Sequence, residues 1–324
     1  MSCNEFDLIA RYFEQQNVNR NDVIVGIGDD CALLEVPEGC QIAISTDTLA
    51  AGTHFLADAD PKLVAHKALA ANLSDLAAMG ADPAWVSLAL TMPEADETWL
   101  TGFCEGFFSL AEYFNLQLIG GDTTKGPLSI TITVQGFVPR GKSLRRSGAK
   151  IGDWIYVTGE LGDSAAGLAL ILTPPDKLNS IEKQLVERHY LADPRIVTGI
   201  TLREFASSAI DISDGLISDL GHILKQSNVA AIINVDNLPL SPELIASHDD
   251  LSQAQKIALT SGEEYELCFT VPNHKREQLT VEMQRNGINA TCVGQIKPGI
   301  GLQLLNNEQK VDWSSLSGYD HFKS

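Results

Sequence analysis

The 324-residue sequence contains no apolar run that approaches the roughly 18 residues of a membrane-spanning helix, which excludes an ordinary helical membrane protein. Its opening segment, MSCNEFDLIARYF, carries acidic side chains and lacks the basic-then-apolar order of a secretory signal. The pattern instead predicts an amphipathic helix with Phe6, Ile9, Tyr12 and Phe13 on its apolar face. We therefore expect a cytoplasmic protein without a membrane partner.

Basic residues are also scarce, with 23 Lys and Arg against 42 Asp and Glu and a formal net charge of −19. Binding to the phosphates of nucleic acid or of an anionic membrane needs a basic face, so both classes of partner are disfavoured. If the ligand is itself anionic, positive charge must be supplied locally, and metal ions are the obvious source.

Paired cysteines are missing as well, because the six cysteines are scattered and form no CxxC motif. A chain of this length can bury a sizeable core without disulfides. We expect reduced and mostly buried thiols.

Short β-branched runs alternate with longer helical patterns along the chain, which predicts an α/β or α+β fold rather than a bundle or a sandwich. Strands are expected at Val23–Ile27, Gln41–Ser45, Trp85–Leu90, Leu116–Ile119, Ser129–Phe137, Trp154–Thr158, Ala209–Ile212, Ala230–Val235 and Tyr265–Val271. Helices are expected at Pro61–Met79, Glu97–Phe114, Asp163–Leu172, Ile181–Leu191, Leu216–Lys225 and His274–Asn286.

The segment PRGKSLRRSGAKIG, residues 139–152, is rich in glycine and cations and has no apolar period. It predicts a domain boundary. We expect an N-terminal domain over residues 1–140, a linker over 141–152 and a C-terminal domain over 153–324.

A phosphate-binding P-loop motif also occurs in this region, since GFVPRGKS (Gly136–Ser143) satisfies G-x-x-x-x-G-K-[ST]. A true P-loop needs a helix directly after the serine, so that aligned backbone amides face the phosphates. Only four residues separate Ser143 from Gly148, and a strand is expected from Trp154. We therefore do not assign Lys142 to a nucleotide.

Aspartates recur where apolar strands run into small residues, in VIVGIGDD, IAISTDT, LQLIGGDTT and AIDISDG. A single such aspartate usually serves as a turn or cap, whereas four such sites predict a shared face at the ends of the strands. The aspartates of this predicted face are Asp29, Asp30, Asp47, Asp122, Asp211 and Asp214.

Converging carboxylates require cations, because two of them 4 Å apart repel by about 4 kcal/mol at an effective dielectric near 20. Oxygen ligands favour Mg²⁺, Ca²⁺ or Mn²⁺, and Mg²⁺ usually shares its ligands with substrate phosphates. In KALAANLSDLAAMG, Asn72 and Asp75 share one face of a helix otherwise rich in alanine and leucine, so Asp75 is a further candidate ligand.

Between Asp122 and Asp153 there are six cations and no acid. This segment is either a solvated linker or a phosphate-binding region in which an arginine such as Arg146 holds two phosphate oxygens.

Nine motifs, taken in order, resemble the thiamine-monophosphate kinase family: GIGDD, STDTLAAGTHF, NLSDLAAMGADP, GGDTT, RSGAKIGD, GDSAAGL, DISDGL, SGEEYEL and GYDHF. They span Gly26 to Phe322. This family belongs to the aminoimidazole-ribonucleotide-synthetase-like, or PurM-like, superfamily. The resemblance implies a two-domain PurM-like α/β fold, a homodimer formed through the N-terminal sheet, and transfer of phosphate from ATP to thiamine monophosphate with several Mg²⁺ ions.

The resemblance also implies roles for individual residues. Metal ligands are expected at Asp30, Ser45 (through its backbone), Thr46, Asp47, Asp75, Asp122, Asp211 and Asp214, of which Asp30, Asp47, Asp122 and Asp214 are expected to act in catalysis. Nucleotide contacts are expected from Gly121, Asp122, Arg146 and Ser213, and contacts to thiamine monophosphate from His54, Glu263 and Tyr319. Tyr319 or Trp313 can offer an aromatic face to the cationic thiazolium and Glu263 a counter-charge, and packing of the C-terminal tail is an equal alternative for Trp313.

One motif departs from the family pattern: the usual GGEDYEL reads SGEEYEL, with Ser261 for glycine and Glu264 for aspartate. Glu264 keeps the charge on a longer side chain.

Other members of the superfamily fit less well. Selenophosphate synthetase needs a reactive cysteine near the first glycine-rich strand, whereas Cys3 lies in the N-terminal helix pattern. The hydrogenase-maturation member ends in a cysteine, whereas this chain ends HFKS, and aminoimidazole ribonucleotide synthetase is not expected to carry GYDHF. From a different class, a non-catalytic protein that binds divalent metals remains an alternative.

Overall fold

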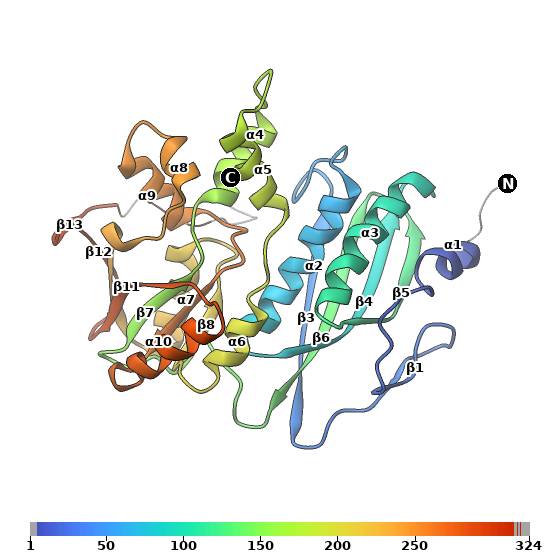
Figure 1. Ribbon diagram of the computed structural model, residues 1–324, viewed down its shortest axis with the longest axis horizontal. Coiled ribbons are helices and arrows are strands. Elements are labelled where there is room, and N and C mark those ends of the chain that lie inside the picture. Colours follow the sequence, from blue (N-terminus) through green and yellow to red (C-terminus); the bar gives the residue numbers. More distant parts are fainter. Residues whose placement is uncertain (1–4, 314–315, 317, 319–324) are drawn as a thin grey trace. The chain divides into compact units, whose positions relative to one another are not determined.

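The computed structural model describes residues 5–313 together with Leu316 and Gly318, and Figure 1 shows its ribbon. The contacts divide the chain into two compact units, Met1–Leu76 with Ala81–Gly141, and Ala77–Gly80 with Lys142–Ser324. No helix in the described part of the chain has both the length and the apolar character needed to cross a membrane.

The first unit is a four-stranded sheet with two helices, α2 and α3, lying across one of its faces (Figure 1). The strand order is β3-β6-β4-β5, with β4 and β5 parallel and the other neighbours antiparallel. The elements of this unit are α1 (Glu5–Tyr12), β1 (Val23–Val25), β2 (Leu33–Leu34), β3 (Cys40–Ala50), α2 (Pro61–Ala78), β4 (Asp82–Met92), α3 (Glu97–Tyr113), β5 (Gln117–Lys125) and β6 (Ser129–Pro139).

Strand β6 shows why the helices cover only one face. Ile130, Ile132 and Val134 are fully buried, whereas the alternating Thr131 and Thr133 remain partly exposed. Alternation with a period of two is typical of an antiparallel strand with one face on the core and one in water. Burying each aliphatic side chain contributes about 1.5–3 kcal/mol, so the β-branched run sets which face the helices cover.

The second unit contains a seven-stranded mixed sheet in the order β13-β12-β9-β11-β7-β10-β8. Its strands are β7 (Trp154–Thr158), β8 (Ser208–Asp211), β9 (Ala230–Asn234), β10 (Leu267–Val271), β11 (Ala290–Lys297), β12 (Gly301–Asn306) and β13 (Gln309–Val311). Its helices are α4 (Asp163–Leu172), α5 (Ser180–Tyr190), α6 (Ile196–Leu202), α7 (Leu216–Ser227), α8 (Pro242–Ala246), α9 (Leu251–Thr260) and α10 (Arg276–Arg285), with short 3-10 helices η1 (Val235–Asn237) and η2 (Asn273–Lys275).

The predicted alternation of strands and helices is confirmed, and β7 and α4 have the predicted bounds. The prediction that strands end at Asp47 and Asp122 is wrong, because β3 continues to Ala50 and β5 to Lys125. Threonine is β-branched and favours strands, and the hydroxyls of Thr46 and Thr48 pair with those of Thr133 and Thr131 across β3 and β6, at 2.9 and 2.8 Å. Thr46 and Thr48 mark the solvent-facing side of β3 rather than its end.

Candidate active site

The first group of predicted residues lies where β3 meets α2. The Ser45 hydroxyl donates to the Asp75 carboxylate, and the Asp47 backbone N–H donates to Asn72 Oδ1 at 3.2 Å. Asn72 is fully buried, and its side-chain amide also donates to the carbonyl of Ala68 at 3.0 Å. The structure therefore brings Ser45, Asp47 and Asp75 together, and Asn72 holds the strand at the correct register beside the helix.

Asp47 is electrostatically strained in the absence of a cation. Burial, together with the neighbouring Asp75 carboxylate, raises the pKa of Asp47 from 3.8 to about 6. Both causes disfavour the charged form, and a bound cation would offset both by stabilising the carboxylate.

Asp122 lies elsewhere on the same sheet. The pairing register aligns it with Ala89, Thr131 and Thr48, whereas Asp47 aligns with Ile132 on β6. Residues directly opposite one another share a face, so Asp122 is placed with Thr46 and Thr48 on the side away from Asp47. β3 and β5 are the two edges of the sheet, which separates their backbones by about 14 Å at about 4.8 Å per strand. The structure thus does not bring Asp47 and Asp122 together within one chain.

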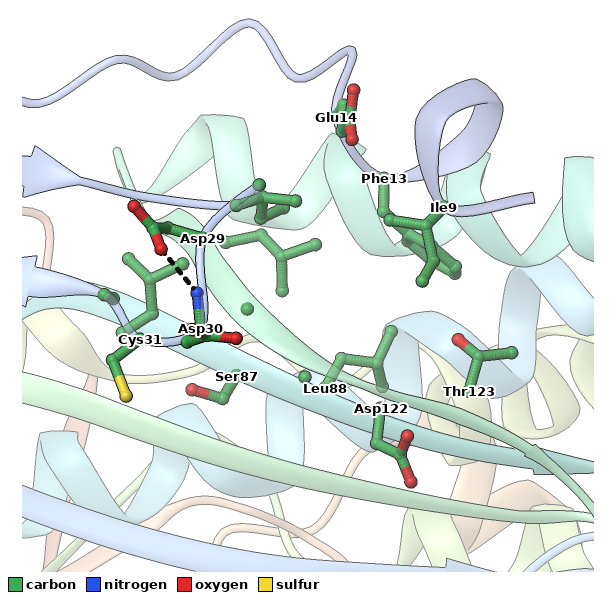
Figure 2. Close-up of a pocket in the computed structure, with 17 residues that line it drawn as sticks. Ile9, Phe13, Glu14, Asp29, Asp30, Cys31, Ser87, Leu88, Asp122 and Thr123 are labelled. Atoms are coloured by element: carbon green, nitrogen blue, oxygen red, sulfur yellow. Dashed lines mark hydrogen bonds between the residues drawn. The ribbon is translucent and has the colours of Figure 1, made fainter. Parts of the chain in front are cut away.

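A cavity of about 700 Å³ contains the second group of predicted residues. Figure 2 shows Asp30, from the loop that follows β1, and Asp122, from β5, lining this cavity with Ser87 of β4. The Asp30 backbone N–H donates to Asp29 Oδ1 at 2.8 Å, which shapes the loop. Gly121 and the exposed Cys31 also line the cavity, so the predicted nucleotide contacts of the first unit share one hollow with an acidic loop.

His54 lies in the turn after β3 and is tied to its surroundings by two hydrogen bonds. Its Nδ1 accepts from the Ala50 backbone N–H at 3.1 Å, and its carbonyl accepts from Lys67 Nζ at 3.2 Å. Lys67 is fully buried on α2, and sequence reasoning missed it. The signal was available, because Lys67 precedes Asp75 by eight residues on the same small-residue helix, which places both on one face.

In the second unit, two loops carry the remaining described candidates. Asp211 ends β8 and is buried, and Ser213 and Asp214 follow it as partly exposed residues before α7 begins. The Glu263 backbone N–H donates to the Ser213 carbonyl at 2.8 Å. The structure therefore places the predicted metal and nucleotide residues of this unit beside the predicted substrate residue Glu263.

Asp219, in the first turn of α7, is a residue that sequence reasoning missed. Its Oδ2 accepts hydrogen bonds from the backbone N–H groups of Ser213, Asp214 and Gly215, at 3.1, 3.0 and 3.0 Å. Burial raises the pKa of Asp219 to about 7, against the lowering effect of these three hydrogen bonds. An acid five residues after Asp214 in DISDGLISDL was the signal in the sequence.

The two departures in SGEEYEL contact one another. The Ser261 hydroxyl donates to Glu264 Oε1, which also accepts from the Gly162 backbone N–H at 2.8 Å, just before α4. Glu264 is partly exposed as a residue, but its carboxyl group is enclosed by protein, and this burial raises its pKa to about 8. The serine hydroxyl and the Gly162 N–H therefore satisfy one oxygen of the longer acid.

Of the three predicted substrate residues, Glu263 and His54 are placed, and Tyr319 lies outside the described residues. Glu263 Oε2 lies 4.0 Å from Nε2 of the buried His189. Gly318 lies against the loop that bears Asp214, because a Cβ on Gly318 would lie 2.3 Å from the Asp214 carbonyl oxygen. Trp313 packs against the core of the second unit and under Lys256 Nζ, 5.2 Å from its ring centroid, so packing accounts for it.

The cationic segment forms no P-loop. No helix occurs between Ser143 and Trp154, and Lys142 Nζ pairs with Glu204 Oε1 at 2.7 Å. Arg146 is exposed, and its carbonyl accepts a hydrogen bond from the Ser227 hydroxyl at 3.3 Å. Arg146 is therefore available to an anionic ligand, whereas Lys142 already has a carboxylate partner.

Among the described residues, no three His, Cys, Asp or Glu side chains gather as a preformed metal site. Mg²⁺ does not need one, because it commonly takes one or two protein carboxylates and completes its shell with water and substrate phosphates. Asp47 and Asp75 fit that requirement, because Ser45 bonds to Asp75 beside Asp47 on β3, and the Asp75 carboxylate is near enough to raise the pKa of Asp47 after burial has done so.

Comparisons with known proteins identify the family of this chain. Residues 28–138 match the profile of AIR synthase related protein, N-terminal domain, and residues 150–304 match that of its C-terminal domain. The thiamine-monophosphate kinase of Salmonella typhimurium is 55% identical to this chain and covers 99% of both sequences. The chain belongs to the thiamine-monophosphate kinase family.

Solved structures of this family share the fold. The thiamine-monophosphate kinase of Stenotrophomonas maltophilia superimposes with a TM-score of 0.86 at 42% identity, over 96% of this chain and 99% of that one. A structure of AaThiL complexed with AMPPCP and TMP superimposes with a TM-score of 0.77 at 30% identity, over 98% of this chain and 97% of that one. The expected two-domain PurM-like fold is confirmed.

Proposed function

We propose that this protein transfers the γ-phosphoryl group of ATP to the phosphate of thiamine monophosphate, with Mg²⁺ bound. The observation that carries the proposal is full-length similarity to thiamine-monophosphate kinases, one of which was solved with AMPPCP, an ATP analogue, and TMP. In the reaction, a phosphate oxygen of thiamine monophosphate bonds to Pγ, the bond from Pγ to the β–γ bridging oxygen breaks, and ADP leaves with that electron pair.

The acceptor phosphate is already ionised at neutral pH, so the reaction needs no strong general base. Its difficulty is the approach of two polyanions, and positioning and electrostatic stabilisation supply most of the catalysis. Bound Mg²⁺ supplies neutralisation of charge on the phosphates and on the phosphoryl group in transfer. The acid-rich groups found here suit that task.

The proposed roles follow the two units. Oxygen ligands for Mg²⁺ come from Asp30, Ser45, Thr46, Asp47, Asp75, Asp122, Asp211 and Asp214. Gly121, Asp122, Arg146 and Ser213 contact the nucleotide. His54, Glu263 and Tyr319 contact thiamine monophosphate, with Glu263 as the counter-charge to the thiazolium and Tyr319 as an aromatic face.

The protein is further proposed to be a cytoplasmic homodimer that pairs through the open face of the first sheet. The side of that sheet away from α2 and α3 exposes Ile44 at 65% and Thr46. In one chain Asp47 and Asp122 stand at opposite sheet edges, and pairing through this face would let one copy's edge approach the other's.

A phosphoryl-transfer assay tests the function. With ATP and Mg²⁺, we expect thiamine monophosphate to be converted to thiamine diphosphate, and we expect thiamine and unrelated phosphomonoesters to be poor acceptors. Production of thiamine diphosphate is followed by chromatography, with EDTA as the metal-free control. Binding of Mg²⁺ without turnover of any acceptor would instead favour a non-catalytic metal-binding protein.

Alkylation of Cys31 tests the nucleotide cavity separately. Cys31 is exposed and lines the cavity beside Asp30, whereas Cys292 lies in the second unit and is partly buried. With Mg²⁺ and ATP at ten times its Kd, we expect alkylation of Cys31 by iodoacetamide to slow by about tenfold, since about one site in eleven stays empty. Peptide mass spectrometry reports each cysteine, and Cys292 is the internal control. Equal labelling of Cys31 with and without ATP would show that the nucleotide does not bind in this cavity.

A further inference from the structure

The loop that carries Ser213 and Asp214 is held from within by a single carboxylate. Asp219 Oδ2 accepts three consecutive backbone N–H groups, those of Ser213, Asp214 and Gly215, at 3.0–3.1 Å. Asp219 is only 2% exposed, so these bonds are shielded from water. Three donors on one buried oxygen make a strong attachment, because loss of the acceptor would leave three buried N–H groups unsatisfied.

The location of Asp219 explains why the loop needs it. Gly215 is the N-cap of α7, and its own N–H, like those of Ser213 and Asp214 before it, has no acceptor within the helix. Asp219 lies in the first helical turn and reaches back to accept hydrogen bonds from all three N–H groups.

While the N–H groups of this loop bind Asp219, its carbonyl groups contact neighbouring segments. The Ser213 carbonyl accepts from the Glu263 N–H at 2.8 Å, and the Asp214 carbonyl lies beside Gly318. One loop therefore contacts both the segment that carries Glu263 and Gly318. Movement of this loop would disturb the metal, nucleotide and substrate residues of this unit together.

We infer that Asp219 is a positioning residue, which sets the orientation of Ser213 and Asp214 toward Mg²⁺ and ATP without contacting either ligand. This inference rests on the proposed function for the identity of the ligands. Loss of Asp219 should therefore change the Mg²⁺-ATP dissociation constant and kcat, and not only the stability of the fold.

Three variants separate positioning from charge and from stability. D219N keeps an acceptor oxygen and loses the charge, whereas D219A loses both. Asp153 is the matched control: it is 4% exposed, accepts from the Lys150 backbone N–H at 2.9 Å and the Ser207 hydroxyl at 2.6 Å, and precedes β7 at the sheet end opposite Asp211. D153A should lose stability and keep its kinetic constants.

The measurements are the dissociation constant of Mg²⁺-ATP by calorimetry, the Mg²⁺ activation constant, and kcat with thiamine monophosphate. For D219A we expect kcat to fall and the Mg²⁺-ATP dissociation constant to rise. The ratio of kcat to that dissociation constant should fall by about 100-fold, the size of effect expected when groups at a reacting centre are displaced. For D219N we expect the same ratio to fall by only about fivefold, because the amide oxygen still accepts hydrogen bonds from the loop.

The outcomes are distinct. Equal losses in D219N and D219A would show that charge alone matters and would overturn the inference, as would D219A constants that match those of D153A. If D219A does not fold, D219N decides the matter, and wild-type constants in D219N would overturn the inference. A wild-type protein that binds Mg²⁺-ATP but makes no thiamine diphosphate overturns the proposed function alone, since the dissociation constants of the variants still test Asp219. A wild-type protein that neither binds Mg²⁺-ATP nor makes thiamine diphosphate overturns both the proposed function and the role of Asp219.

Discussion

Replacing Asp47 by asparagine is expected to lower kcat by on the order of 10³-fold while making the metal-free protein more stable. Turnover falls because the amide cannot neutralise or hold a cation as the carboxylate does. Stability rises because burial and the Asp75 carboxylate raise the pKa of Asp47 to about 6, which means that its charge is a cost to the folded state. The backbone bond from Asp47 N–H to Asn72 does not involve the substituted side chain.

The pH dependence of this stability has a definite sign. The carboxyl of Asp47 titrates near 3.8 when the chain is unfolded and near 6 in the fold. A group with a raised pKa contributes stability that is complete below the lower value and is lost as the pH rises through the higher one. In EDTA, wild-type protein should therefore lose stability between pH 4 and pH 6. Relative to it, D47N should gain about 1–2 kcal/mol at pH 7, after allowance for partial solvent exposure of Asp47.

Urea denaturation in EDTA at several pH values measures this effect, and D122N is the matched control. Asp122 is exposed at the opposite edge of the sheet, so D122N should lose turnover to a similar extent without gaining stability. A D47N enzyme with wild-type turnover would show that Asp47 is not a metal ligand. An unchanged free energy of unfolding at pH 7 would show that Asp47 and Asp75 do not repel in the free protein.

Gly121→Ala is expected to destabilise the first unit by on the order of 3 kcal/mol and to weaken binding of Mg²⁺-ATP. The physical reason is the close approach of β5 to β4, since a Cβ at Gly121 would lie only 1.8 Å from the Leu88 carbonyl oxygen. That oxygen is backbone and cannot rotate away, so the two parallel strands must separate. Both residues line the cavity with Asp122, and its wall would shift with them.

The neighbouring glycine provides the control for this prediction. A Cβ at Gly120 meets no atom within 4 Å, so Gly120→Ala should change the free energy of unfolding by no more than about 0.5 kcal/mol. Urea denaturation of both variants gives the comparison, and calorimetry gives the dissociation constant of Mg²⁺-ATP for G121A. A G121A protein as stable as G120A would show that β4 and β5 leave room for a Cβ at position 121.

The local sequence determined most of the secondary structure and the position of Asp75 on the buried face of α2. The alternation in β6 and the helical runs of α2 and α4 follow from side-chain periodicity, which depends only on near neighbours. The pairing of Asp75 with β3 was also foreseeable, because two polar residues on a helix of small residues need a partner when buried. The ordered motifs predicted the family, and the comparisons confirmed it.

Only the tertiary structure decided which acids lie together. The strand order β3-β6-β4-β5 places Asp47 and Asp122 at opposite edges and on opposite faces, although both follow similar apolar runs. The sequence contained signals for Lys67 and Asp219, but only the structure showed which groups their side chains bind and that both are buried. Strand register joins segments that are distant in the sequence, and the enclosure of a polar group depends on everything that packs around it, so both are settled only when the chain packs as a whole.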